Sequence, residues 1–400
     1  MERSSGARQQ LIEGVRLPPF RVRQRHIIGV TLPYTVERSL PPLSRLDVVS
    51  CAGAEVSAGA SRTSQLKVVC HAVCDYGETL QRQHKEVCMS SRRRPPKLQP
   101  GMTIGIVTPS SPVRDRGRIE RGVAVLATLG FQTIFGAHAH DRRPYRAEDD
   151  RSRADDLLAM FFRDDVDAVM CVQGGYGGIR TMRWLDADRL AQLARRPPKP
   201  FIGFSDITYP HIVLGKALDC TTFWGPNLAQ LDGMSDYTCA AFCRALMETE
   251  PFDVLPDPDD PYVETLVPGV AEGELVGGTL RPIVCLTGTP WELDLRGKIF
   301  FFEGAGMPPI EADRLLGQML LAGRLQECAG IIIGEHVGRP EGETLFFDEV
   351  FDDLIRPLGI PTLYHMPLGH GKHLATVPLG ARVRLDATTK TLQVLEPGVC

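Results

Sequence analysis

The sequence has no long hydrophobic run. No stretch approaches the roughly 18 uncharged apolar residues of a membrane-spanning helix, and the longest strongly apolar ones, residues 299–302 and 330–334, have the length of a strand. Hydrophobic residues make up 43% of the chain and charged residues 24%. This balance is ordinary for a globular protein and argues against a mostly disordered, collagen-like or membrane-embedded chain. We therefore expect no membrane contact.

Two common signature motifs are also missing. The sequence contains no G-x-x-x-x-G-K-[ST] phosphate loop and no His-Glu-x-x-His zinc helix, which disfavours a phosphate cradle and a zinc site of those kinds. The formal net charge is −4 at pH 7. The whole chain thus has no excess of positive charge for nucleic acid, and we expect no nucleic-acid partner.

The first hundred residues differ in composition from the rest. They hold 16 Lys and Arg against 8 Asp and Glu, a balance of +8, whereas the other 300 hold 29 against 41, a balance of −12. Residues 1–88 show little of the sustained hydrophobic periodicity of a helix or a strand. The apolar segment of a signal peptide does not follow the N-terminal Met. We predict that residues 1–96 are an extension, either poorly ordered or the product of a translation start placed upstream of Met89.

The 11 cysteines do not form a recognisable metal pattern. Cys70 and Cys74 are spaced as C-x-x-x-C, but no second pair stands at zinc spacing. For the four cysteines of the extension, incidental residues and a metal or disulfide cluster both remain open. Several of the other seven lie in apolar runs, among them Cys171 and Cys285, which favours reduced, buried thiols in a cytosolic protein.

Strand-like and helix-like segments alternate from residue 102 onward. This alternation predicts an α/β fold in which helices cover both faces of a parallel sheet, over residues 97–250. Residues 251–273 are rich in proline and acid and lack a period, so they are predicted as a linker. A second β/α domain is predicted over residues 274–400. The expected strands are 102–109, 131–136, 166–175, 199–204, 297–304 and 330–335; the expected helices are 116–131, 153–162, 206–218, 311–326 and 346–356.

Polar residues at the ends of strands are the first candidates for chemistry, because ligands of open α/β sheets bind beyond the carboxyl ends of the strands. Ser205 stands where a predicted strand turns into a helix, Glu303 ends an apolar strand, and His370 lies in a glycine-flanked loop. A serine nucleophile requires a base, and the base requires an orienting acid. These three residues are therefore a candidate nucleophile, acid and base, with a helix N-cap as the alternative for Ser205.

Three further features carry alternatives. The segment QGGYGG at 173–178 could present backbone N–H groups to an oxyanion, form a plain tight turn or cradle a phosphate. His365, His370 and His373 could ligate a metal, although no zinc helix accompanies them. Glu335 follows a predicted strand and is either a substrate contact or an ordinary strand-end residue.

Seven segments between about residues 97 and 390 occur in a characteristic order: GMTIGIVTPSSP, QGGYGGIR, IGFSDITYPHIVLGKAL, FWGPNL, GGTLRPIVCLTGTPWELDLRGKIFFFEG, EADRLLGQMLLAG and LGHGKHLATVPLGARVRLD. Together they resemble the LD-carboxypeptidase family, that is, the muramoyltetrapeptide carboxypeptidases, which also includes microcin C immunity proteins. The resemblance implies an N-terminal domain similar to class I glutaminases, a smaller swivelling C-terminal domain, and a site between them.

The resemblance also implies a serine peptidase without metal or organic cofactor. Its triad falls on Ser205, Glu303 and His370, and its oxyanion hole falls on the backbone amides of Gly175 and Asp206, with Gly174 as the other candidate. The implied reaction releases D-Ala from the murein tetrapeptide during cell-wall recycling, by a homodimer in the cytoplasm. The alternatives are an immunity-type hydrolase of aminoacyl- or peptidyl-nucleotides and a binding module with an inactive triad.

The sequence departs from the family pattern at several positions. It has Gln173 where Arg is frequent, Thr279 where Asn follows the glycine pair, and Trp224 where a histidine often precedes Gly-Pro. We expect these positions to shape the substrate pocket. The substrate-contact candidates are Gly174, Tyr176, Trp224 and Glu335.

Overall fold

The computed structural model describes residues 92–141, 149–259, 261–337 and 346–400. The four cysteines of the predicted extension and Met89 lie outside these ranges. Residues 92–98 are packed rather than separate from the domain: the Arg93 amide donates to the carbonyl of Asp219 at 2.9 Å, and Arg93 forms a parallel bridge with Cys220. Ordered structure therefore begins before the predicted boundary at residue 97. In the described ranges, no helix has the length and apolar character needed to cross a bilayer.

The first sheet has six strands in the order β12-β5-β4-β3-β1-β2. Five are parallel, and β12, which comes from the C-terminal part of the chain, pairs antiparallel with β5 at the edge. The predicted N-terminal parallel sheet is thus confirmed. The strands are β1 (Thr103–Val107), β2 (Gln132–Phe135), β3 (Ala168–Cys171), β4 (Phe201–Gly203), β5 (Thr222–Trp224) and β12 (Val377–Leu379).

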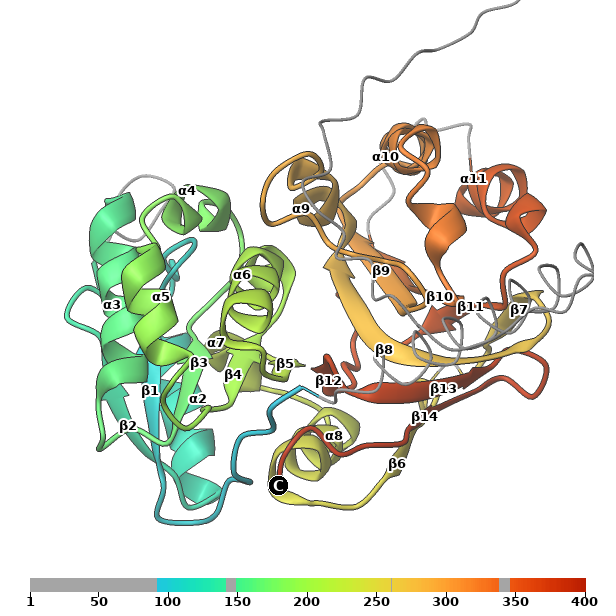
Figure 1. Cartoon of the computed structure of the whole chain (residues 1–400). Coiled ribbons are helices and arrows are strands. Elements are labelled where there is room, and N and C mark those ends of the chain that lie inside the picture. The colour runs from blue at the N-terminus through green and yellow to red at the C-terminus, as the bar shows by residue number, and fades with distance from the viewer. Residues whose placement is uncertain (1–91, 142–148, 260, 338–345) are drawn as a thin grey trace, which may run out of the picture. The chain divides into compact units, whose positions relative to one another are not determined.

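Helices cover both faces of this sheet (Figure 1). Alternate residues of β3 enter different cores: Val169 and Cys171 share one with α3, α5 and α6, whereas Ala168 and Met170 share another with α2, α7 and α8. Burial on both faces explains why these strands are continuous apolar runs. The helices are α2 (Arg116–Thr128), α3 (Asp150–Phe162), α4 (Gly178–Met182), α5 (Ala187–Leu193), α6 (Thr208–Leu218), α7 (Leu228–Leu231) and α8 (Asp236–Met247).

An aspartate cap sets the start of α3. The Asp149 carboxylate accepts hydrogen bonds from the amides of Arg151 at 3.0 Å and Ser152 at 3.1 Å. A carboxylate in this position satisfies N–H groups that lack helical acceptors and lies at the positive end of the helix dipole. The helix therefore begins before the predicted Arg153, so that Asp150 and Arg153 share one turn.

The second sheet is mixed, with eight strands in the order β6-β14-β13-β8-β9-β10-β11-β7. Strands β8 to β11 are parallel to one another, and the remaining pairs are antiparallel. The strands are β6 (Phe252–Val254), β7 (Glu264–Val267), β8 (Val270–Thr279), β9 (Ile299–Ala305), β10 (Gly330–Val337), β11 (Thr362–Met366), β13 (Arg382–Asp386) and β14 (Thr391–Val394).

The segment 251–273, predicted as a linker, is not a simple connection. It contains β6, β7 and the first residues of β8, because its apolar residues pair with other strands of the second sheet on both sides of the proline-rich stretch. The C-terminal segment 377–394 supplies β12, β13 and β14, and thereby strands for both sheets.

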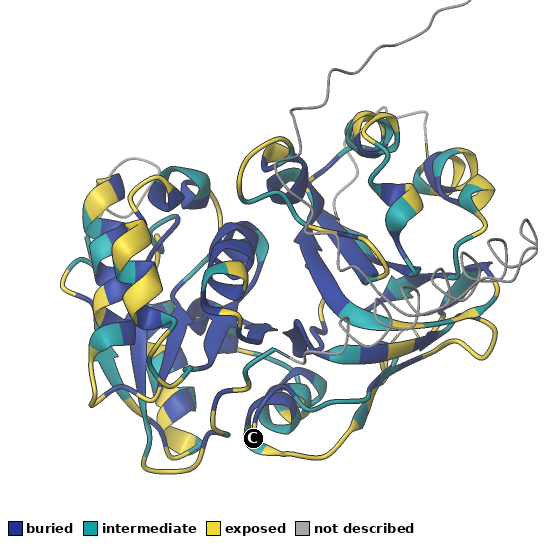
Figure 2. Cartoon of the chain, in the orientation of Figure 1, coloured by how far each residue is buried: buried dark blue, intermediate teal, exposed yellow. Residues whose placement is uncertain are grey.

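Strand β9 lies at the centre of the second sheet and is buried on both faces. Phe300 and Phe302 share a core with Leu316 and Phe351, whereas Phe301 belongs to the core on the opposite face. Figure 2 shows central strands such as β3 and β9 buried, whereas exposed residues lie on the outer sides of the helices and in strands such as β13. Burial of each large apolar side chain contributes roughly 1.5–3 kcal/mol to the free energy of folding. The three phenylalanines therefore hold β9, with Glu303 after them, in a fixed position in the sheet. The helices are α9 (Leu280–Cys285), α10 (Pro309–Leu321) and α11 (Phe347–Leu354), with short η1 (Ser205–Ile207), η2 (Leu325–Glu327) and η3 (Arg356–Leu358).

Candidate active site

Ser205 occupies a strained turn between β4 and α6. Its φ of 69° lies in the left-handed region, where a residue other than glycine pays about 1–3 kcal/mol. The preceding Phe204 is fully extended, so the chain reverses direction at the serine. A strand-to-helix turn of this kind exposes the hydroxyl at the edge of the sheet. The helix-cap alternative does not apply, because Phe204 stands at the cap position of η1 and the Ser205 hydroxyl contacts His370.

The structure brings the three candidate triad residues together. His370 Nε2 lies 3.0 Å from Ser205 Oγ, and His370 Nδ1 lies 2.6 Å from Glu303 Oε2. Glu303, two residues before the end of β9, is fully buried. His370 is in the loop after β11, so Glu303 and His370 come from the part of the chain that forms the second sheet, and Ser205 comes from the first. A hydroxyl, an imidazole and a carboxylate in this order can transfer the hydroxyl proton and stabilise the resulting imidazolium.

The loop that carries His370 is held from both ends. The Trp224 indole N–H donates to the Leu368 carbonyl at 2.8 Å, and the Gly371 amide donates to Glu335 Oε2 at 2.9 Å. Gly371 has no room for a side chain, since a Cβ there would lie 2.1 Å from Glu335 Oε1. The prediction of Trp224 as a substrate contact is wrong: the ring is 0% exposed and packs edge-on against Phe204.

A bulge in β10 places Glu335. The pairing of β10 with β9 shifts register between Ile333 and His336, and such a bulge re-aims a side chain at the end of a strand. Burial is the main cause that raises the pKa of Glu335 to about 7; the charges of Asp257 and Glu303 add to the rise, and the Gly371 hydrogen bond opposes it. The carboxyl group therefore changes its charge near neutral pH, directly beside the His370 loop.

The glycine pair, Gly174 and Gly175, lies close to Ser205 and Ser111. A Cβ on Gly174 would be 2.8 Å from Ser205 Cβ and 3.1 Å from its Oγ, whereas a Cβ on Gly175, whose φ is +102°, would meet Ser111 Oγ at 2.5 Å. Asp206 lies in the first turn of the helical segment after Ser205, where backbone N–H groups have no acceptor within the helix. The backbone of Gly174 and that of Asp206 thus both lie next to Ser205.

The side chain of Asp206 ties this turn to two neighbouring loops. It accepts hydrogen bonds from the Gly178 amide at 2.7 Å and from the Ser110 hydroxyl. Burial raises the pKa of Asp206, and these hydrogen bonds oppose the rise. The carboxyl group is therefore occupied with loop contacts, and it is the backbone of Asp206 that the oxyanion prediction concerns.

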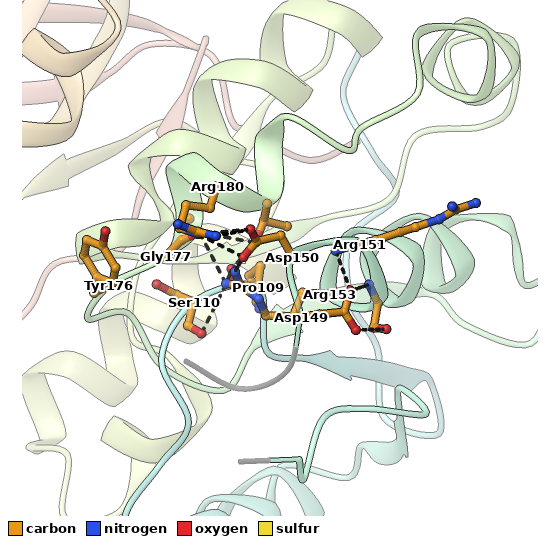
Figure 3. A network of polar contacts seen from close by, with 12 residues as sticks. Pro109, Ser110, Asp149, Asp150, Arg151, Arg153, Tyr176, Gly177 and Arg180 are labelled. Carbon is orange, nitrogen blue, oxygen red and sulfur yellow. Dashed lines mark hydrogen bonds and ion pairs between the residues drawn. The ribbon is translucent and has the colours of Figure 1, made fainter. Parts of the chain in front are cut away.

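A buried arginine braces the same two loops (Figure 3). Arg153 is 1% exposed, and its guanidinium donates to the carbonyls of Pro109 at 2.6 Å and Gly177 at 3.3 Å and pairs with Asp150 at 2.6 Å. Burial would raise the pKa of Asp150, but hydrogen bonds from Arg180 and Arg153 outweigh it and hold that pKa at about 2. Sequence reasoning missed this ion pair, although the i, i+3 spacing of Asp150 and Arg153 was a signal.

The remaining candidate residues, Tyr176, Gln173, His365 and His373, do not contact the side chains of Ser205, His370 and Glu303 in any hydrogen bond of the described residues. Tyr176 is 53% exposed beside the glycine pair, while Gln173 donates weakly, at 3.4 Å, to the Pro112 carbonyl. The three histidines of 365–373 do not converge: the ring of His365 stacks on Tyr364, and His373 contacts Ser235 at 2.7 Å and Asp259 at 3.0 Å.

Two threonines near the triad were not predicted as its contacts. The Thr279 hydroxyl donates to Glu303 Oε1, and Thr208, in the first turn of α6, bonds the Ser205 carbonyl at 2.7 Å. Thr279 had been expected in the substrate pocket. Its contact follows from the strand register, in which Thr279 of β8 stands opposite Glu303 of β9.

Comparisons with known proteins place the chain among carboxypeptidases. Models of the LD-carboxypeptidase N-terminal and C-terminal domains match residues 104–225 and 272–385. A probable murein peptide carboxypeptidase of Bacillus subtilis is 35% identical over 312 residues, which cover 76% of this chain and 95% of that protein.

Solved structures share the fold. A muramoyltetrapeptide carboxypeptidase from Oxalobacter formigenes aligns with a TM-score of 0.64 and 26% identity, over 73% of this chain and 97% of the other. The microcin C7 self immunity protein MccF in its wild-type apo state aligns with a TM-score of 0.70 and 24% identity, over 77% of this chain and 99% of the other.

Proposed function

The chain belongs to the LD-carboxypeptidase family, and we propose that it uses Ser205, His370 and Glu303 to release the terminal D-alanine of a murein tetrapeptide. The observation that carries this proposal is the chain of contacts from the serine hydroxyl through the imidazole to the buried carboxylate, at 3.0 and 2.6 Å. Two of the relatives are named for murein peptides, which supports this substrate class.

The reaction proceeds through an acyl-enzyme. His370 takes the proton of Ser205 as the serine oxygen attacks the carbonyl carbon of the amide bond, and Glu303 stabilises the imidazolium. The imidazolium then gives its proton to the amine of the leaving D-alanine. A water molecule, deprotonated by the same imidazole, hydrolyses the ester and restores the serine.

The backbone amides of Gly175 and Asp206 would bind the oxyanion that forms in both steps, with Gly174 as the alternative donor. The position of Asp206 in a first helical turn supports its share, and the closeness of Gly174 to Ser205, whose Oγ would lie 3.1 Å from a Cβ on that glycine, keeps Gly174 as the alternative donor. One such donor typically contributes about 10²–10³ in rate. Tyr176 and Glu335 lie near these groups and would contact the substrate.

The test is product analysis by mass spectrometry. Wild-type protein should release D-alanine from a murein tetrapeptide and leave an otherwise equal peptide that ends in L-alanine intact. The variant S205A should release none while it keeps the thermal unfolding temperature of the wild type. Turnover by S205A at the wild-type rate would refute the assignment of the nucleophile.

A second candidate function has one specific support. The fold is shared with MccF, which has been solved in complex with aspartyl sulfamoyl adenosine, and the exposed ring of Tyr176 could stack on a nucleobase. The same assay, with aspartyl sulfamoyl adenosine as substrate, separates the two candidates. Release of aspartate with no release of D-alanine would favour the second.

We further propose that the reaction takes place in the cytoplasm and that the protein is a homodimer. The seven cysteines of the described ranges are all free thiols, which is typical of a reducing compartment. Cys171, Cys220 and Cys328 are buried, whereas Cys285, which was expected to be buried, is exposed. Light scattering coupled to gel filtration would measure the mass of the assembly, and a monomer mass at micromolar concentration would refute the dimer.

A further inference from the structure

The triad is part of a closed ring of hydrogen bonds that runs through Thr208 and Thr279, which we call the threonine bridge. From Glu303 the ring continues to the Thr279 hydroxyl. The Thr279 amide donates to Thr208 Oγ1 at 3.0 Å, and the Thr208 hydroxyl donates to the Ser205 carbonyl at 2.7 Å. His370 closes the ring between Ser205 and Glu303.

The bridge connects the two sheets at the point where the triad is assembled. Thr208 belongs to α6, directly after the nucleophile, and Thr279 ends β8, beside the acid on β9. The close approach depends on Gly278, whose φ is +142° and whose Cβ would lie 2.6 Å from Thr208 Oγ1. The backbone therefore leaves space for the Thr208 hydroxyl at this place.

Burial makes the bridge hard to replace by water. Glu303 and Thr208 are 0% exposed, and Thr279 is 7% exposed. One oxygen of Glu303 serves His370, so the other requires its own donor, because a carboxylate oxygen left without one in a dry site is costly. The Thr279 hydroxyl supplies that donor and at the same time limits rotation of the carboxylate.

We propose that Thr279 is a positioning residue of the triad: it orients Glu303, and through Thr208 it fixes the distance between the acid and the nucleophile's turn. The inference rests on the proposed roles of Ser205, His370 and Glu303. A fixed carboxylate holds His370 with its proton on Nδ1, so that Nε2 can accept the proton of the serine. Substrate binding does not require the bridge, so its loss should lower kcat and leave KM nearly unchanged.

The experiment compares valine and serine variants at both threonines. Valine preserves the shape of threonine without its hydroxyl, whereas serine preserves the hydroxyl. A hydrogen bond to a charged group typically contributes 1.5–3 kcal/mol, so T279V should lower kcat about 10–100-fold with KM within about twofold. T279S should stay within about threefold of the wild type, and T208V should lower kcat in the same direction as T279V.

The matched control is T221V. The Thr221 hydroxyl is also buried and donates to a backbone carbonyl, that of Gly398 at 2.7 Å, but it takes no part in the ring. The T221V variant should have a lower free energy of unfolding than the wild type and the same kcat. Because the two bridge residues act in one ring, the loss in T279V/T208V should be smaller than the product of the single losses.

Two results would overturn the inference: a T279V protein with the kcat of the wild type, or a T279S protein as slow as T279V. A separate readout keeps the inference distinct from the proposed function. If the wild type labels with a fluorophosphonate but releases no D-alanine, the substrate assignment fails. The labelling rates of T279V and T279S then test the bridge on their own.

Discussion

Replacement of Glu303 by glutamine should disable the base while the fold stays intact. The two carboxylate oxygens now accept from His370 on one side and from the Thr279 hydroxyl on the other. In E303Q, if the amide oxygen keeps the Thr279 bond, the amide NH₂ faces His370 Nδ1. The imidazole must then carry its proton on Nε2, toward Ser205, where it can no longer accept the proton of the nucleophile.

The opposite orientation of the amide is also unproductive. The amide oxygen then accepts from His370 Nδ1 and keeps the right tautomer, but the negative charge that stabilises the imidazolium is lost. A change of a triad carboxylate to its amide that imposes the wrong tautomer lowers kcat about 10⁴-fold, which corresponds to about 5 kcal/mol of transition-state stabilisation. We expect a loss of that order, since Glu303 is fully buried and no solvent can compensate.

The assay is the initial rate of D-alanine release at saturating tetrapeptide, with the thermal unfolding temperature measured alongside. The matched control is E311Q, because Glu311 pairs with Arg281 at the partly exposed start of α10 and does not contact the triad. E311Q should keep the wild-type kcat. A folded E303Q protein whose kcat lies within about tenfold of the wild type would refute the role of Glu303.

Two further changes test the surroundings of the triad. The variant G174A places a methyl group 2.8 Å from Ser205 Cβ, so kcat should fall about 10²–10³-fold through displacement of the hydroxyl or an oxyanion donor. By contrast G317A, on α10 with open space around it, should raise the free energy of unfolding by about 0.5–1 kcal/mol at unchanged kcat. If G174A and G317A had the same kcat, the predicted effect of Gly174 would be wrong. Because the pKa of Glu335 is raised to about 7 in the folded protein, its stabilising contribution is complete below about pH 4.5 and is lost as the pH rises toward 7. Denaturant titrations should therefore show that the free energy of unfolding of the wild type falls by about 2 kcal/mol relative to that of E335Q between pH 5 and pH 8. If the free energies of unfolding of the two proteins changed in parallel with pH, Glu335 would not titrate in this range.

The sequence was sufficient to predict the parallel sheet and the positions of Ser205, Glu303 and His370. Apolar strands with polar residues at their carboxyl ends are local features, and the topology of an α/β sheet brings those ends together. The boundaries of α3 and of the predicted linker were less accurate. Both depend on interactions that are distant in the sequence or outside the apolar period, such as the Asp149 cap and the pairing of β6 with β14.

The sequence could not give the contacts between strands. That Thr279 stands opposite Glu303 is a consequence of the register of β8 on β9, and register is set by the packing of whole strands. The same limit explains Trp224. At the last position of β5, its indole could equally have faced a pocket, and the antiparallel pairing of β12 with β5 helps to bury it against the His370 loop.

These two corrections have a common meaning for substrate choice. Both Thr279 and Trp224 were expected in the pocket because they depart from the family pattern. Each instead supports a member of the triad, Thr279 through Glu303 and Trp224 through the backbone at Leu368. Both side chains are buried, and their polar groups are already bonded to the protein. We therefore expect substrate selection to depend on groups that solvent reaches near Ser205, such as the exposed ring of Tyr176 beside the glycine pair.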